Sequence, residues 1–178
     1  RLAFTPLSIP TKIRADPPGP VHMMNDISGI LTLRAVDASL TAANKKALFQ
    51  QLATAAARLT GIPAKKIASS LNARERIGST GFGGGTAIPH GKVEGLPHVF
   101  GYFARLSGPI DFHAVDGMPV DLVFLLLSPP DAGAEHLKAL ASVSRTFRDR
   151  DTLAKLRGAR SKDALFALLA GEETRDAA

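Results

Sequence analysis

The segment VDLVFLLL, residues 120–127, decides the fold class of this 178-residue chain. Within it, Leu122 to Leu127 form the longest uninterrupted apolar run, far short of the roughly 20 residues that a membrane-spanning helix needs. A short continuous apolar run is typical of a strand that is buried on both faces of a sheet. We therefore expect a central strand here, and no direct insertion into a membrane.

The segments around this strand alternate between extended and helical patterns. One-sided apolar spacing, capping residues and glycine stops mark the helices. The expected strands are 30–36, 99–106 and 120–127, and the expected helices run from a cap at Ser39 or Thr41 to Gly61, from Pro63 to Ala73, over 133–148 and over 161–170. Asp116-Gly117 is a turn signal, and 78–95 is a glycine-dense loop with a short extended segment. Strands mixed with helices predict a single layered α/β domain.

The composition is that of a globular protein, with 45% apolar and 21% charged residues. Cysteine is absent, which excludes disulfides, thiolate metal sites and a cysteine nucleophile and suits a reducing cytosol. The net charge of +6 and the pI near 10.0 would permit a nucleic-acid partner. However, the basic residues form no block and are not interleaved with exposed aromatics, so we expect no nucleic-acid partner and a mildly basic enzyme surface.

Residues 1–23 differ from the rest of the chain. They hold five prolines, at positions 6, 10, 17, 18 and 20, and no apolar period. Met23 and Met24 follow directly. We expect an extension that is disordered or not native, and a folded domain over 24–178.

The most informative stretch for chemistry is GSTGFGGGTAIPHGK, residues 78–92. Glycines let a backbone approach a ligand closely and turn its N–H groups toward an anion. The stretch matches neither of two common nucleotide-binding motifs. Thr86 stands where a Walker A loop and a dinucleotide fingerprint each need glycine, and Val93 follows Lys92 in place of a metal-binding hydroxyl.

In this stretch His90 lies between Pro89 and Gly91. The fixed φ of proline and the missing side chain of glycine predict an imidazole that is rigidly placed and accessible to a ligand. Such a ring can be a nucleophile, a general base or a metal ligand, and the alternative is an ordinary surface histidine. The spacing of the five histidines assembles no metal site, so we expect no metal and no cofactor.

Two further residues are candidates for phosphate contacts. His136 falls in the first turn of an expected helix, where a neutral ring could donate an N–H to a phosphate. Its alternative is a half-buried histidine bonded to a backbone carbonyl. Arg74, just before the glycine-rich stretch, could bind a phosphate through paired hydrogen bonds, or could lie at a solvated helix end.

Several motifs in this order resemble one family. They are Arg74-Glu75, Gly78-Ser79-Thr80-Gly81, Ala87-Ile88-Pro89-His90-Gly91-Lys92, Pro119-Val120-Asp121-Leu122-Val123-Phe124 and His136-Leu137. The chain is similar to the type-2 IIA domains of the bacterial phosphoenolpyruvate-dependent phosphotransferase system, above all to their nitrogen-regulatory branch. The resemblance covers roughly Met24 to Ala170 and implies a three-layer α/β/α sandwich with a central mixed β-sheet. Phe82 and Gly84 depart from the usual residues of the family.

The resemblance also implies a function. His90 would accept a phosphoryl group from a phosphohistidine of an HPr-like carrier, with His136 and Arg74 as its partners in transfer. Ser79, Thr80 and Gly81 would be lesser phosphate-binding residues. The chain would be a cytoplasmic phosphotransferase component acting in nitrogen or metabolic regulation on targets such as sensor kinases or transporters.

Alternatives remain open at this point. A stand-alone sugar-specific component of the mannitol or fructose type would have a similar sequence. A binding-only regulator and, from the pI alone, a nucleic-acid-binding domain are alternatives of another class.

Overall fold

The structure is a computed structural model that describes residues 26–171. The extension expected over 1–23 and the start expected at Met24 lie outside the described residues. In chain order the strands are β1 Val36–Leu40, β2 Gly81–Gly83, β3 Thr86–Ala87, β4 His90–Lys92, β5 Phe100–Ile110 and β6 Val120–Ser128. The α-helices are α1 Lys45–Thr60, α2 Ala64–Ile77, α3 Gly133–Arg148, α4 Arg150–Gly158 and α5 Lys162–Ala170, and the 3-10 helices are η1 Asp26–Gly29 and η2 Leu33–Ala35.

Strand β6 is the centre of a six-stranded mixed sheet with the order β1-β5-β6-β3-β2. It pairs antiparallel with β5 along one edge and parallel with β3 and then β4 along the other. Every side chain from Leu122 to Leu127 is 0% exposed. The prediction of a central strand that is buried on both faces is confirmed.

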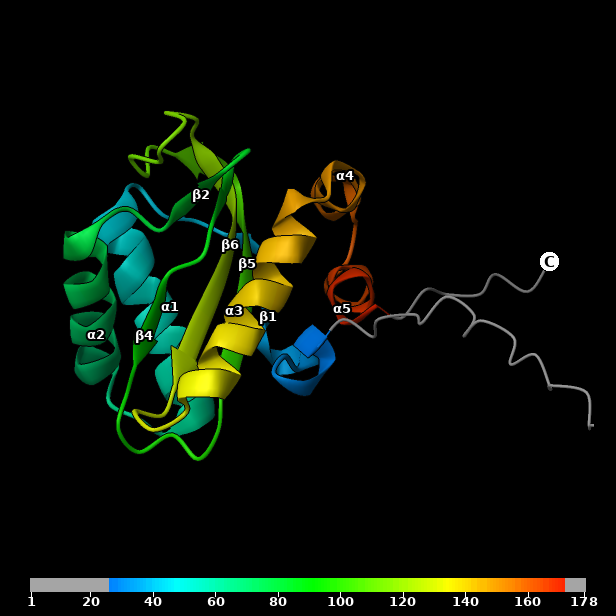
Figure 1. The fold of residues 1–178 in the computed structure, drawn as a ribbon. Helices are drawn as coiled ribbons and strands as arrows, with labels where there is room; N and C mark the ends of the chain where they lie inside the picture. The colour runs from blue at the N-terminus through cyan, green and yellow to red at the C-terminus, as the bar shows by residue number, and fades with distance from the viewer. Residues whose placement is uncertain (1–25, 172–178) are drawn as a thin grey trace, which may run out of the picture.

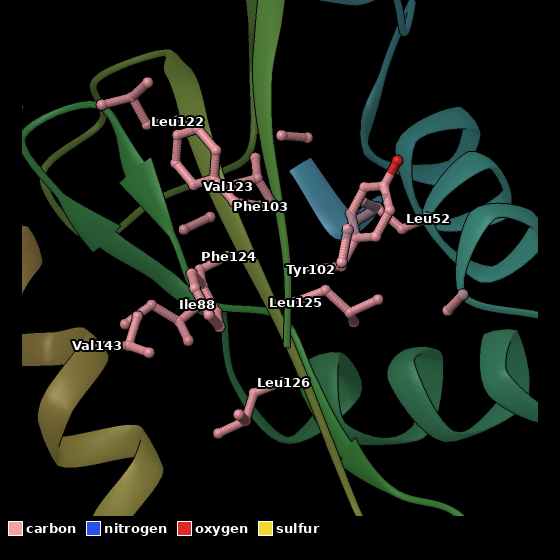
Figure 2. Packing of buried hydrophobic residues seen from close by; sticks show 14 of the residues in the cluster. Leu52, Ile88, Tyr102, Phe103, Leu122, Val123, Phe124, Leu125, Leu126 and Val143 are labelled. Carbon is pink, nitrogen blue, oxygen red and sulfur yellow. The ribbon is translucent and has the colours of Figure 1, made fainter. Parts of the chain in front are cut away.

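Helices cover both faces of this sheet. Figure 1 shows α1 and α2 on one side of β6 and α3 on the other. In Figure 2, Tyr102 and Leu125 lie toward Leu52 of α1, whereas Ile88 and Phe124 lie toward Val143 of α3. The expected three-layer α/β/α sandwich with a mixed sheet is confirmed. None of the helices within 26–171 is long and apolar enough to cross a membrane.

The strand expected over 30–36 is wrong for most of its length. Residues 33–35 form the 3-10 helix η2, and the strand β1 begins only at Val36. The reason is visible in the burial, because Ile27, Leu31 and Ala35 are buried while Leu33 is 39% exposed. The apolar residues that enter the core are spaced by four rather than by two, which is a helical and not an extended spacing.

Three further expectations need correction. The cap of α1 is neither Ser39, which lies in β1, nor Thr41, but Asn44, whose side chain accepts from the Ala47 amide. Helix α2 begins after Pro63 as expected but continues past Ala73 to Ile77. The glycine-dense loop expected over 78–95 with one short extended segment contains three short strands, β2, β3 and β4.

Helix α4 was not predicted at all. Asp149 ends α3 and, in the same extended conformation, caps α4 by accepting from the Asp151 amide. The helix buries only Leu153 and Leu156, so its apolar period is too short to stand out. The expected helices over 133–148 and 161–170, the helix stops at Gly61 and Gly171, and the turn at Asp116-Gly117 are confirmed.

Candidate functional site

His90 lies on a strand that runs along one edge of β6. Thr86 and His90 pair with Leu122 and Leu126, so β3 and β4 keep one register with β6 across the break at Ile88-Pro89. Pro89 has no N–H to donate, but its carbonyl still accepts from the Leu126 amide at 3.0 Å. The chain before Pro89 and the chain after it both pair with β6. His90 is therefore fixed by the sheet and does not lie in a free loop.

Close packing requires glycine at position 91, which the sequence did not reveal. A Cβ at this position would collide with the Ser70 hydroxyl of α2, and that hydroxyl donates to the Lys92 carbonyl at 2.8 Å. Only glycine lets α2 approach β4 so closely. This approach brings Arg74, one turn further along α2, beside His90.

The hydrogen bonds of His90 define its tautomer. Its Nδ1 lies 2.7 Å from the Ile88 carbonyl oxygen, which can only accept, so Nδ1 carries the proton. Its Nε2 accepts from Arg74 Nε at 3.1 Å, which requires a free lone pair. Burial, and then the charge of Arg74, lower the pKa of His90, against the opposing effects of the Ile88 bond and Glu75. His90 is thus a half-buried neutral imidazole whose lone pair on Nε2 faces a guanidinium.

Arg74 is positioned but not neutralised. Besides its bond to His90, its Nη1 donates to the Gly78 carbonyl at 2.9 Å and thereby fixes the end of α2. Within the described part of the chain it forms no ion pair. The adjacent Glu75 is already engaged, because its carboxylate accepts from Lys45 Nζ at 2.8 Å and from the Thr80 amide.

The three lesser candidates lie directly after α2. The Thr80 side chain is buried, and both its hydroxyl and its amide donate to Glu75. The Gly81 amide donates to Ser79 Oγ at 3.2 Å. Gly81 also packs so tightly against Ala114 that a Cβ would not fit. In this arrangement Thr80 and Gly81 build the turn, and the Ser79 hydroxyl retains its proton for another acceptor.

His136 lies across from His90 in the first turn of α3. The ring centroids of the two histidines are 5.7 Å apart, with 47° between the ring planes. The ring of His136 is buried, and its Nδ1 lies 2.6 Å from the hydroxyl of Ser128, not against a backbone carbonyl. Burial, followed by His90 and Lys92, lowers the pKa of His136.

The fold thus brings His90, His136 and Arg74 together from β4, α3 and α2. Sequence reasoning missed Ser128, because its position directly after the apolar run 122–127 does not show which residue of another element it contacts. Within residues 26–171 no three histidine or acidic side chains gather as a metal site would require. The arrangement can present one nucleophilic ring nitrogen to an anion, with N–H donors and a positive charge around it.

Comparisons with known proteins point in one direction. The family model described as "Phosphoenolpyruvate-dependent sugar phosphotransferase system, EIIA 2" matches residues 29–171. A "Nitrogen regulatory protein" of Bradyrhizobium diazoefficiens is 48% identical over 144 residues, which cover 81% of this chain and 94% of the relative.

Two further relatives extend this comparison. The crystal structure of the nitrogen regulatory protein IIA-Ntr from Neisseria meningitidis matches with a TM-score of 0.77 and 35% identity, covering 80% of this chain and 98% of that one. A "PTS system fructose-specific EIIA component" of Haloferax volcanii is 32% identical over 148 residues, covering 83% and 96% of the two chains.

Proposed function

This chain belongs to the EIIA 2 family of the phosphoenolpyruvate-dependent sugar phosphotransferase system, and we propose that it carries a phosphoryl group on His90. The resemblance inferred from the sequence motifs is confirmed by the family match. The observation that carries the assignment to His90 is its pair of hydrogen bonds. The Ile88 carbonyl holds the proton on Nδ1, and the lone pair on Nε2 faces Arg74.

In the proposed reaction, His90 Nε2 attacks the phosphorus of a phosphohistidine on an HPr-like carrier. The new N–P bond forms as the old one breaks, and the electron pair of the broken bond returns to the ring nitrogen of the carrier. No proton has to leave His90 first, because Nε2 is already unprotonated. The lowered pKa of His90 keeps the ring in this neutral form.

Arg74 and His136 have separate roles in this proposal. When a phosphoryl group occupies Nε2, the guanidinium of Arg74 turns from the ring nitrogen to the phosphoryl oxygens and stabilises their negative charge. His136 donates an N–H to the same group from the opposite side. The Ser79 hydroxyl is a lesser candidate donor, while Thr80 holds Glu75 in place.

The phosphorylated and free forms of His90 differ by about two negative charges at a half-buried position, which a protein partner can distinguish. Two relatives named nitrogen regulatory protein support a regulatory output for this chain. The proposed targets of that output, sensor kinases or transporters in the cytoplasm, come from the resemblance of the sequence motifs alone. The fructose-specific relative supports a second candidate, in which the phosphoryl group passes onward to a sugar-specific component.

Intact-mass measurement tests the proposal. The full chain is incubated with a phosphorylated HPr-like carrier, and we expect the mass of one phosphoryl group, labile to acid and stable to base. His90→Ala should gain none and keep its fold, whereas the control His98→Ala, at an exposed histidine, should gain one. A phosphoryl gain by His90→Ala would overturn the assignment. Onward transfer to a sugar-specific acceptor would favour the second candidate.

A further inference from the structure

We propose that Ser128 is a positioning residue for phosphoryl transfer, because its hydroxyl holds His136 in the tautomer that carries its proton on Nε2. This inference rests on the proposed function and deepens it. It assigns a task to a residue outside the motifs that characterise the site.

The sheet explains why Ser128 faces His136. Side chains alternate between the two faces of a strand, so Phe124, Leu126 and Ser128 share one face of β6. Figure 2 shows that Phe124 lies on the side of α3, toward Val143. His90 pairs with Leu126 in parallel register and shares this face. Ser128, the last residue of β6, thus reaches the first turn of α3, where His136 lies.

Burial decides the direction of the hydrogen bond between the two side chains. Ser128 is 0% exposed, so its O–H proton cannot be given to bulk water. Among the described residues its hydroxyl has a single hydrogen-bond partner, His136 Nδ1 at 2.6 Å. If Nδ1 were protonated, the serine would have to accept from it, and its own buried proton would be left without an acceptor, which is costly. The serine therefore donates, Nδ1 accepts, and the ring proton of His136 lies on Nε2.

The same bond disfavours the charged ring. An imidazolium carries a proton on both nitrogens, so its Nδ1 could no longer accept the hydrogen bond from the Ser128 hydroxyl. Burial lowers the pKa of His136 in the same direction, and so do His90, whenever it carries a proton, and Lys92. His136 thus remains a neutral donor.

The two histidines are in this way held in complementary tautomers, each through its Nδ1. The Ile88 carbonyl fixes the proton of His90 on Nδ1 and leaves a lone pair on Nε2. Ser128 fixes the opposite arrangement in His136 and leaves an N–H on Nε2. With the rings 5.7 Å apart, the site offers one nucleophilic nitrogen and one donor to the same phosphoryl group.

Nitrogen-15 NMR of the histidine side chains tests the tautomer in the unphosphorylated full chain, so the result does not depend on whether His90 accepts a phosphoryl group. We expect His136 to carry its proton on Nε2 in the parent protein. In Ser128→Ala, a second population protonated on Nδ1 should appear. The matched control is Ser142→Ala, which removes another buried serine hydroxyl near His136 in sequence, one that donates to Lys138 and does not touch the ring.

Transfer from the phosphorylated carrier provides the second readout. Ser128→Ala should slow transfer about two- to tenfold, the effect of one hydrogen bond on the tautomer ratio. Ser142→Ala should transfer at the parental rate. A parental His136 protonated on Nδ1, or a Ser128→Ala variant with the tautomer and rate of Ser142→Ala, would overturn the inference. If the parent gains no phosphoryl group at all, the proposed function fails, while the NMR result still decides the role of Ser128.

Discussion

The two ends of β6 each bring an arginine against an ionisable side chain, with opposite results. At the start of the strand, Arg157 of α4 meets the carboxylate of Asp121 through Nε at 2.9 Å and Nη2 at 2.8 Å. At the other end, Arg74 of α2 meets the neutral ring of His90. The first pair neutralises its charges, and Asp121 raises the pKa of Arg157. In the second pair no described residue forms an ion pair with the guanidinium, and burial first and then this charge lower the pKa of His90.

This difference separates a structural contact from a chemical site. Arg157 also donates to the Gly84 carbonyl, so its pairing fastens α4 to the glycine-rich turn between β2 and β3. Among residues 26–171 Arg74 has hydrogen bonds to His90 and Gly78 but no anionic partner, so its charge can pair with an incoming anion. A charge left unpaired at a rigid site is therefore a better sign of function than a charge that is well paired.

Arg74→Ala should show the largest effect on transfer. The variant removes the positive charge that stabilises the phosphoryl oxygens, and loss of such a donor typically slows a reaction about 10²- to 10³-fold. Single-turnover transfer from the phosphorylated carrier measures it. The control is Arg76→Ala, which removes an exposed charge from the same last turn of α2. Equal rates for the two variants would show that Arg74 serves only to end the helix.

His136→Ala should follow, with transfer about 10- to 150-fold slower, since one charge-assisted hydrogen bond contributes about 1.5–3 kcal/mol. His136→Gln should lie between Ala and the parent, because its amide can still offer an N–H. His90 should remain phosphorylatable in both variants. A parental rate in His136→Ala would reduce His136 to a packed histidine.

Arg157→Ala should give the reverse pattern. Loss of the bidentate contact to Asp121 and of the hydrogen bond to the Gly84 carbonyl should lower the free energy of unfolding by about 1–2 kcal/mol. The effect is modest because the ion pair is partly exposed to solvent. Transfer should change less than about twofold. Chemical denaturation measures the first and the carrier assay the second, with Lys155→Ala on the same helix as the control. A loss of transfer without a loss of stability would contradict the structural role that we assign to Arg157.

The smallest expected effect is the loss of folding stability when the pH is lowered. The folded pKa values of His90 and His136 are below the ordinary value of 6.5, so between these values the unfolded chain binds more protons. The contribution of both rings to stability is therefore complete above about pH 6.5 and is lost as the pH falls through that value toward the folded pKa values. Melting temperatures across this range should fall less steeply in a His90→Ala/His136→Ala double variant. Identical slopes would contradict the lowered pKa values.

Much of this account could be predicted from the sequence, and the features of the site that were missed share one cause. The burial of Leu122 to Leu127 and the bounds of α3 follow from local patterns, and the nearness of His90 to His136 and Arg74 follows from the resemblance that the motifs carry. The role of Gly91 does not, because it depends on the side chain of Ser70 from another element. The hydrogen-bond partner of His136 was missed for the same reason. Residues that act across two elements leave no local period for the sequence to reveal.

The central claim is that the nucleophile is Nε2 of His90. Nitrogen-15 and phosphorus-31 NMR of the phosphorylated full chain tests it most directly, because coupling between the two nuclei identifies the nitrogen that carries the phosphoryl group. The account predicts coupling to Nε2 of His90, with the proton retained on Nδ1 against the Ile88 carbonyl. Coupling to Nδ1 of His90, or to either nitrogen of His136, would contradict it.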